Sequence, residues 1–257
     1  MSLHHRDMEE HGDGTPLCDQ GVSAMPCPAG QSSDSLTDTL QESLSSVSKA
    51  IYFWGSLTAT VLPGYFGQKM GIVNDFHHWN FITDNCVLGA LPVVTKVGES
   101  GDHLVQLREQ LKAKSQVLGL VVACMEEIEI RGFGISMIQF ADEAAWRYYV
   151  NPLVEYVRLP MADTTADVSP KDVAQAVDCI HRCISKRRQA AYIHCKAGKG
   201  RSWMVTMCYL TTYGGMTFED AEKLVAARRP QVNPSESQRN FAMKFATGEK
   251  RQRDPSQ

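Results

Sequence analysis

The stretch AYIHCKAGKGRSW (residues 191–203) decides the fold of this chain, because a buried strand ends within it and a helix begins within it. The strand is the apolar run that leads to Cys195, and the residues that follow are small, flexible or basic. Glycine lets the chain turn tightly, so that successive backbone N–H groups face one concavity. The helix that begins near Arg201 adds unpaired N–H groups and the positive end of its dipole. The sequence therefore predicts an anion cradle with the Cys195 thiol at its base.

This cradle predicts a particular chemistry for Cys195. A positive environment at a helix N-terminus lowers the pKa of a cysteine to about 3.5–7.5, so an ionised nucleophile is expected at neutral pH. Arg201 can hold two phosphate oxygens with its planar guanidinium, and Ser202 can donate a hydrogen bond to the sulfur. A thiolate beneath a bound phosphate is the arrangement for in-line phosphoryl transfer.

Two other interpretations of the loop fit its sequence less well. A nucleotide-binding P-loop needs Ser or Thr after its Gly-Lys pair, and here Gly200 follows Gly198 and Lys199. A structural cysteine in a glycine turn would need none of the flanking residues, whereas Cys195 lies in the pattern His-Cys-x-x-Gly-x-x-Arg-Ser after a buried strand.

The loop resembles the signature of a known superfamily. HCKAGKGRS (residues 194–202) matches the H-C-x-x-G-x-x-R-[ST] motif of the cysteine-dependent protein tyrosine and dual-specificity phosphatases. By this resemblance Cys195 forms a phosphocysteine intermediate, Arg201 stabilises the transition state, and neither a metal nor an organic cofactor is implied. The resemblance also implies that His194 supports the loop and that the following residues bind the phosphate: Lys196, Ala197, Gly198, Lys199, Gly200, Arg201 and Ser202.

Such an enzyme also needs a general acid that protonates the leaving oxygen. In the dual-specificity branch this is an aspartate on a loop after an earlier strand, and RLPMADTTADVSP (residues 158–170) offers Asp163 and Asp167. Asp163 follows the strand closely and is preferred. Asp167 lies just before Ser169 and fits a carboxylate at a turn or a helix entry better.

Within the superfamily, residues 50–245 resemble the mitochondrial phosphatases that dephosphorylate phosphatidylglycerophosphate. CVLGALP (86–92) resembles the first strand of that group, and VVACMEEIE (121–129) resembles its strand followed by paired glutamates, here Glu126 and Glu127. Trp203 occupies a position where much of the superfamily has Gly. This difference is compatible with the resemblance to the lipid phosphatases and fits a resemblance to ordinary protein tyrosine phosphatases less well. The resemblance implies a phosphorylated lipid substrate, a membrane surface and the mitochondrial inner membrane. The long acidic N-terminal segment is unlike that group and leaves the cytoplasm as the alternative location.

A second resemblance competes with the first. Between Cys195 and Arg201, HCKAGKGR has the same loop residues as the tensin-homologue phosphoinositide phosphatases. By this resemblance, Lys196 and Lys199 would contact further phosphates of an inositol ring. No segment resembling the C2 domain of that group follows the last predicted helix. Phosphatidylglycerophosphate is therefore expected first, phosphoinositides second and phosphoproteins third. The alternative outside enzymes is a pseudophosphatase that binds phosphate without turnover.

The rest of the chain predicts an α/β fold. Apolar runs at 86–92, 117–124, 153–160 and 191–195 indicate buried strands, and helical periodicity lies between them. Ser169, Thr217 and Ser235 carry helix-capping signals. The predicted class is a dual-specificity-phosphatase-like fold, with a central sheet flanked by helices and the phosphate loop at a strand-to-helix junction.

Composition limits the remaining possibilities. The chain has 257 residues and a net charge of −3, which gives no reason to expect a nucleic-acid partner. It has eight cysteines and no apolar leader, a combination that favours free thiols in a reducing compartment. Cys179, His181 and Cys183 share a helical pattern, but no second ligand pair has zinc-like spacing, so no metal site is expected.

Four segments are predicted along the chain. Residues 1–47 are rich in Ser, Asp, Gly and Pro and are expected to be disordered. Segment 48–80 includes an uncharged run at 50–68 that is nearly long enough to span a bilayer. Its Gly and Pro residues weaken that interpretation, and its aromatic ends suit a helix packed on the domain or one lying at a membrane interface better. Residues 81–247 are the predicted phosphatase domain, and 248–257 are a solvated tail.

Overall fold

The computed structural model describes residues 41, 44–45, 47–48, 51–55, 57, 70, 77–94, 103–131 and 139–248. Most of the segment predicted to be disordered, 1–47, and all but the first residue of the tail predicted at 248–257 lie outside the described residues. The chain divides into two units, Met1–Leu44 and Ser45–Gln257. Gln41 and Leu44 of the first unit are helical, and the second unit contains the features described below.

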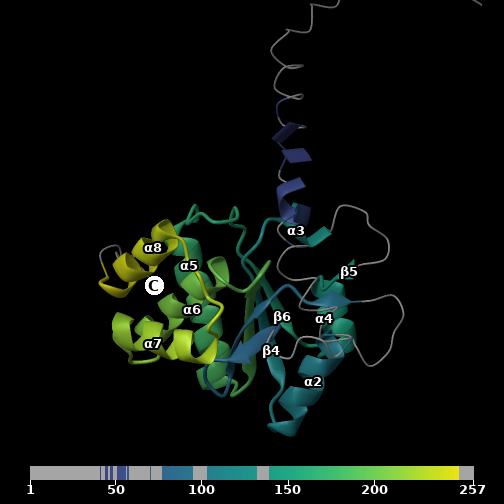
Figure 1. Cartoon of the computed structure of the whole chain (residues 1–257). Helices are drawn as coiled ribbons and strands as arrows, with labels where there is room; N and C mark the ends of the chain where they lie inside the picture. Colours follow the sequence, from purple (N-terminus) through teal and green to yellow (C-terminus); the bar gives the residue numbers. More distant parts are fainter. Residues whose placement is uncertain are drawn as a thin grey trace, which may run out of the picture. The chain divides into compact units, whose positions relative to one another are not determined.

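A five-stranded sheet forms the centre of the second unit (Figure 1). Its order is β1-β2-β7-β4-β6, with β1 antiparallel to β2 and the other neighbours parallel. Because parallel strands end at one edge of a sheet, the central position of β7 places Cys195 between the ends of β2 and β4. The strands are β1 (Trp79–Phe81), β2 (Cys86–Ala90), β4 (Leu118–Ala123), β6 (Glu155–Arg158) and β7 (Ala190–Cys195), with a separate pair β3 (Val93–Val94) and β5 (Gln139–Phe140).

Helices flank the sheet, as the sequence predicts. One side is covered by α5 (Pro170–His181), α6 (Arg201–Thr212), α7 (Phe218–Arg228) and α8 (Glu236–Ala246), and the other by α2 (His103–Ala113) and α4 (Glu143–Tyr149) (Figure 1). A short helix, α3 (Glu127–Arg131), follows β4, and a π-helical turn, Arg182–Lys186, extends α5. The predicted α/β class is therefore confirmed.

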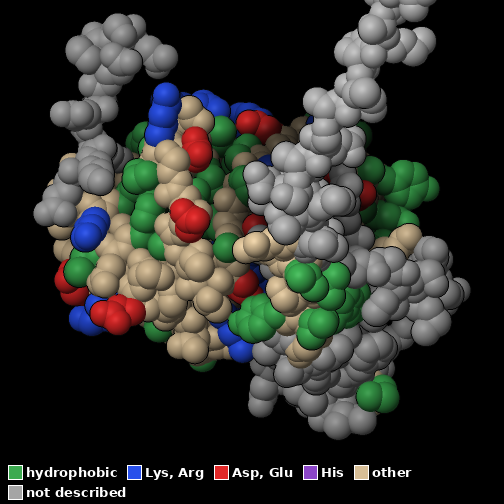
Figure 2. Space-filling model, turned by 90° about the horizontal axis from the view of Figure 1, so that it is seen from above, with side chains coloured by type: hydrophobic (Ala, Val, Ile, Leu, Met, Phe, Trp, Pro, Cys, Tyr) green, Lys and Arg blue, Asp and Glu red, His purple; other side chains and the backbone are tan. Residues whose placement is uncertain are grey.

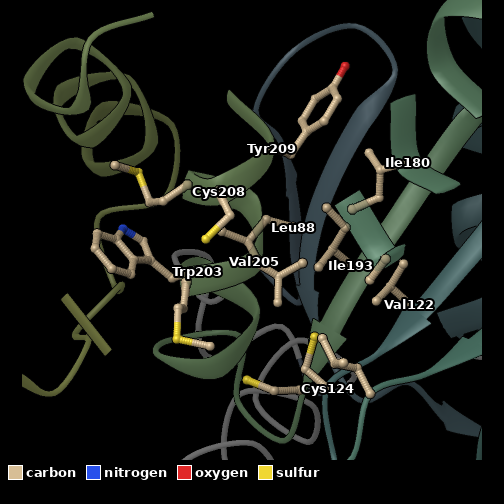
Figure 3. Packing of buried hydrophobic residues seen from close by; sticks show 14 of the residues in the cluster. Leu88, Val122, Cys124, Ile180, Ile193, Trp203, Val205, Cys208 and Tyr209 are labelled. Carbon is tan, nitrogen blue, oxygen red and sulfur yellow. The ribbon is translucent and has the colours of Figure 1, made fainter. Parts of the chain in front are cut away.

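Two hydrophobic clusters follow from the alternation of side chains along the strands. Leu88, Val122 and Ile193 are fully buried on the face toward α5 and α6, and Figure 3 shows them beside Val205 of α6. Their strand neighbours pack on the opposite face, in the cluster that includes Trp146. Residues 201–210 of α6 are all buried, so the start of this helix is fixed relative to the loop before it.

The predicted helix starts are confirmed at atomic level. The hydroxyl oxygens of Ser169 and Thr217 accept hydrogen bonds from backbone N–H groups in the first turns of α5 and α7. Ser235 forms a reciprocal capping box with Gln238 at the start of α8. These caps satisfy N–H groups that a helix otherwise leaves unpaired.

The aromatic segment at 48–80 contributes described residues to the core. Phe53 and Leu57 are buried there, and the ring of Phe53 packs edge-on against Phe140. Ile51 and Tyr52 of the same helical stretch are exposed. In the described part of the chain, no helix has the length and hydropathy needed to cross a membrane. The domain boundary drawn at residue 81 falls within β1, and most of 58–76 lies outside the described residues.

Candidate active site

Cys195 ends strand β7 and is almost fully buried at the base of the loop. The Ser202 hydroxyl donates to its sulfur over 3.2 Å. Burial by itself would raise the pKa of the thiol, but the Arg201 charge and hydrogen bonds from Ser202 and the Lys199 N–H lower it below its ordinary value. The site therefore favours the thiolate, in the direction that the sequence predicts.

Arg201 begins α6 and forms a buried, two-pronged ion pair with Glu129 of α3. Its Nη1 lies 2.6 Å from Glu129 Oε2 and its Nη2 lies 3.0 Å from Oε1, while Nη1 also donates to the carbonyl of Met161. Burial would lower the pKa of Arg201, but the hydrogen bond and charge of Glu129 raise it. Arg201 Nε is buried without a partner in the described structure, an orphaned donor that an oxyanion would satisfy.

Glu129 is a residue that the sequence reasoning missed. The structure places the predicted Glu126 and Glu127 elsewhere: the Glu126 backbone N–H donates to Glu129, and the exposed Glu127 lies 3.5 Å from Arg158. Glu129 is the third glutamate in VVACMEEIE, so the sequence does display a candidate. Identifying it as the partner of Arg201 requires knowing that a helix begins at Glu127.

Asp163 contacts two cations of the site, Arg201 and Lys196. Its Oδ1 lies 3.1 Å from Arg201 Nη2, and its Oδ2 accepts a hydrogen bond from Lys196. Burial would raise the pKa of Asp163, but Arg201 and Lys196 lower it below its usual value. Asp167 is exposed, and its backbone N–H donates to the Thr165 hydroxyl. The structure thus brings Asp163 to the loop, as the preference between the two aspartates predicts.

The other predicted residues differ in their surroundings. Lys196 is buried, and its Nζ lies 4.8 Å from the centre of the Tyr52 ring, whereas Lys199 is partly exposed. His194 is fully buried, and burial lowers its pKa to about 3, so its ring is neutral. Its ring lies near Trp146, which is consistent with support of the strand rather than with proton transfer.

Gly198 provides a test of how tightly the loop is built. Its φ is +67°, and an added Cβ would lie 2.5 Å from the backbone of Gly89. We expect Gly198→Ala to lower kcat/KM for phosphate release by about a hundredfold or more. The added Cβ strains the backbone at a positive φ and also forces the loop to move away from Gly89. Gly215 has the same φ with open space around it, so Gly215→Ala is expected to cost roughly 1–2 kcal/mol of strain and to retain activity. Equal losses in the two variants would contradict the collision with Gly89.

Comparisons with known proteins agree with this geometry. The sequence matches the dual specificity phosphatase, catalytic domain family over residues 112–247. It is 36% identical over 93 residues to phosphatidylglycerophosphate phosphatase PTPMT2 of Arabidopsis thaliana, covering 36% of this chain and 40% of that protein. It is 33% identical over 84 residues to dual specificity protein phosphatase 14 of Mus musculus, covering 33% of this chain and 42% of that protein. The match therefore spans less than half the length of either relative.

A solved structure shares the fold. The crystal structure of PTPMT1 in complex with PI(5)P has a TM-score of 0.52 and 21% identity, covering 66% of this chain and 96% of that one. At this identity the likeness concerns the fold alone. The family match includes more than half of the chain and contains the whole loop from Cys195 to Arg201. The chain therefore belongs to the dual specificity phosphatase catalytic domain family.

Proposed function

We propose that this chain hydrolyses phosphomonoesters through a phosphocysteine intermediate on Cys195. The observation that supports this most directly is the meeting of three groups at one loop: a thiol with a lowered pKa, a buried Arg201 with an unpartnered Nε, and Asp163. A bound phosphate dianion would satisfy the Nε donor and would lie above the sulfur. A structural cysteine accounts for none of these three features.

The proposed reaction has two steps. The Cys195 thiolate attacks phosphorus, the P–O ester bond breaks, and Asp163 gives its proton to the leaving oxygen. A water molecule then attacks the phosphocysteine and passes a proton to Asp163, the P–S bond breaks, and Cys195 leaves as a thiolate that Ser202 stabilises. Arg201 neutralises charge on the transferring phosphoryl oxygens in both steps.

Asp163 must hold a proton when the first step begins. In the structure, Arg201 and Lys196 lower the pKa of this carboxyl and favour its ionised form. A bound phosphate dianion brings negative charge beside Asp163 and competes with it for Arg201. Both changes raise the pKa of Asp163, so substrate binding itself favours the protonated acid.

Asp163→Asn is expected to lower kcat by roughly a hundredfold or more, because the leaving alkoxide then departs unprotonated. In the wild type, kcat should fall as pH rises through the pKa that Asp163 has in the enzyme–substrate complex, since the acid loses its proton. That decline should be absent from Asp163→Asn, while the rise with ionisation of Cys195 remains. Asp167→Asn is the matched control, and full activity of Asp163→Asn would refute this assignment.

The proposed substrate is a phosphorylated lipid, with phosphatidylglycerophosphate first and phosphoinositides second. The name of the Arabidopsis relative supports the first, and the loop resemblance supports the second. One structural observation favours the first: Lys196 is buried and paired with Asp163, which leaves Lys199 as the more accessible of the two loop lysines. A polyphosphorylated inositol ring would use both.

A lipid substrate also implies contact with a lipid surface, and by resemblance the mitochondrial inner membrane. Ile51 and Tyr52 are exposed, and the Tyr52 ring lies over Lys196 beside the loop. On the face shown in Figure 2, Lys and Arg side chains are interspersed with Asp and Glu. Surface contact would therefore rest on these apolar residues more than on a basic patch.

The test is phosphate release from three substrates side by side, with the Cys195→Ser protein as the blank. The substrates are phosphatidylglycerophosphate in mixed micelles, a phosphoinositide panel in the same micelles, and a phosphotyrosine peptide. A Cys195-dependent preference for the first supports the proposal, and a preference for either of the others replaces the substrate. Release from none supports a phosphate-binding pseudophosphatase.

The contact with a lipid surface is tested by flotation with vesicles that contain the preferred lipid. Ile51→Asp is expected to reduce co-flotation of the protein, and unchanged co-flotation would contradict contact through Ile51.

A further inference from the structure

The carbonyl groups of the phosphate loop are all held from outside it. Each carbonyl from residue 196 to residue 200 accepts a hydrogen bond: Lys196 from the Leu91 N–H, Ala197 and Gly198 from the Arg229 side chain, Lys199 from the Asn233 N–H, and Gly200 from the Met204 N–H. Because a peptide group is planar and trans, a carbonyl that points outward turns the next N–H group inward. The loop therefore presents its N–H groups to the concavity above Cys195.

Arg229 is the only side chain among these donors, and it holds two adjacent carbonyls. Its Nε lies 2.8 Å from the Gly198 oxygen, and its Nη2 lies 3.2 Å from the Ala197 oxygen. The peptide after Gly198 bears the Lys199 N–H, which donates to the Cys195 sulfur. The orientation of this donor to the thiolate therefore depends on Arg229.

The rest of the Arg229 guanidinium is anchored in the core. Nη1 donates to the carbonyl of His77 and to Asn80 Oδ1, at 3.1 and 2.7 Å. The side chain is fully buried, and its partners in the described structure are carbonyl and amide oxygens rather than carboxylates. Burial lowers the pKa of Arg229 to about 10, so it stays charged at neutral pH. A buried cation without a carboxylate partner adds positive potential to the loop it holds.

We propose that Arg229 is a positioning residue for this site: it holds the carbonyls of Ala197 and Gly198 so that the N–H groups of Gly198 and Lys199 face the sulfur and the phosphate. This inference rests on the proposed role of the loop in phosphate binding and catalysis. A residue that only joined α7 to β1 would affect stability but would not affect the thiol or the affinity for an oxyanion.

The test compares Arg229→Met and Arg229→Lys with Arg228→Met in the full chain. Arg228, the last residue of α7, is the exposed neighbour of Arg229 and serves as the matched control. Four quantities are measured below the melting temperature of each variant: kcat, KM, the inhibition constant of inorganic phosphate, and the Cys195 pKa from the pH dependence of inactivation by iodoacetate. Circular dichroism reports the folded fraction.

We expect Arg229→Met to raise the inhibition constant of phosphate by tenfold or more, to raise the Cys195 pKa and to lower kcat/KM by about a hundredfold. For each of these quantities Arg229→Lys should lie between the wild type and Arg229→Met, because lysine keeps the charge but cannot make all four hydrogen bonds. If the methionine variant does not fold, the lysine variant provides the same comparison. Folded Arg229 variants with the wild-type phosphate affinity and Cys195 pKa would overturn the proposal.

The same measurements separate this inference from the proposed function. If the wild type releases phosphate from no substrate, but the Arg229 variants still shift the thiol pKa and phosphate binding, the positioning role stands and the catalytic function does not. If the wild type shows Cys195-dependent turnover and the Arg229 variants change only the melting temperature, the catalytic function stands and the positioning role fails.

Discussion

Cys195→Ser is expected to abolish phosphate release from every substrate that the wild type hydrolyses. The loop lowers the pKa of a thiol through Arg201 and the hydrogen bonds from Ser202 and Lys199. A serine hydroxyl has a far higher pKa, so the same surroundings leave it protonated and weakly nucleophilic. The measurement is Cys195→Ser turnover over a range of enzyme concentration, with inorganic phosphate binding as the check that the loop remains intact.

The pH dependence of the wild type sharpens this prediction. Because the Cys195 pKa is lowered, iodoacetate should reach half of its maximal inactivation rate at a lower pH than it does with an ordinary cysteine. Cys208 supplies the control: it is buried in α6, where burial raises its pKa, and Cys208→Ala should retain activity and rapid inactivation. Turnover by Cys195→Ser at the wild-type rate would place the nucleophile elsewhere.

The fold could be predicted from the sequence where periodic patterns are long. The four predicted strands and the helices capped by Ser169, Thr217 and Ser235 all form. The elements without a prediction of their own are short: β1 has three residues, β3 and β5 have two each, α3 has five and α4 has seven. Such lengths give too few residues for hydrophobic periodicity to register. Tertiary packing rather than local pattern decides their structure.

The candidate site likewise contains residues that the sequence predicts and residues that it does not. Cys195, Arg201 and the loop between them are contiguous, so one stretch of sequence predicts them together. Glu129 and Arg229 lie far from the loop in sequence and contact it only in the folded chain. A residue of the same charge lies close to each of them in the sequence. Glu127 and Arg228 have the same charge as these partners but lie on the exposed side of their helices. Burial distinguishes each pair, and burial follows from packing that the sequence does not display.

Arg201→Lys is expected to lower kcat/KM by about a thousandfold. Lysine keeps the charge but loses the planar fork, so it cannot hold both Glu129 oxygens and also present an N–H to a phosphate oxygen. Removing one donor from a transition-state site costs roughly a hundredfold to a thousandfold in other enzymes. The loss should therefore appear mainly in kcat, measured with a saturating soluble phosphomonoester.

Glu129→Gln extends the same argument to the residue that orients the guanidinium. Loss of this buried carboxylate leaves the Arg201 charge balanced only in part, by Asp163 and Cys195, which should cost at most about 3–5 kcal/mol of unfolding free energy. We expect at least a tenfold loss of kcat in the folded protein, because Arg201 is then held less firmly against the substrate. Glu127→Gln is the matched control: its pair with Arg158 is half exposed, and such pairs contribute about 0–1 kcal/mol. If the two glutamine variants behave alike in both stability and kcat, the Glu129 pair does not orient Arg201, and the guanidinium is held by Asp163 and the Met161 carbonyl instead.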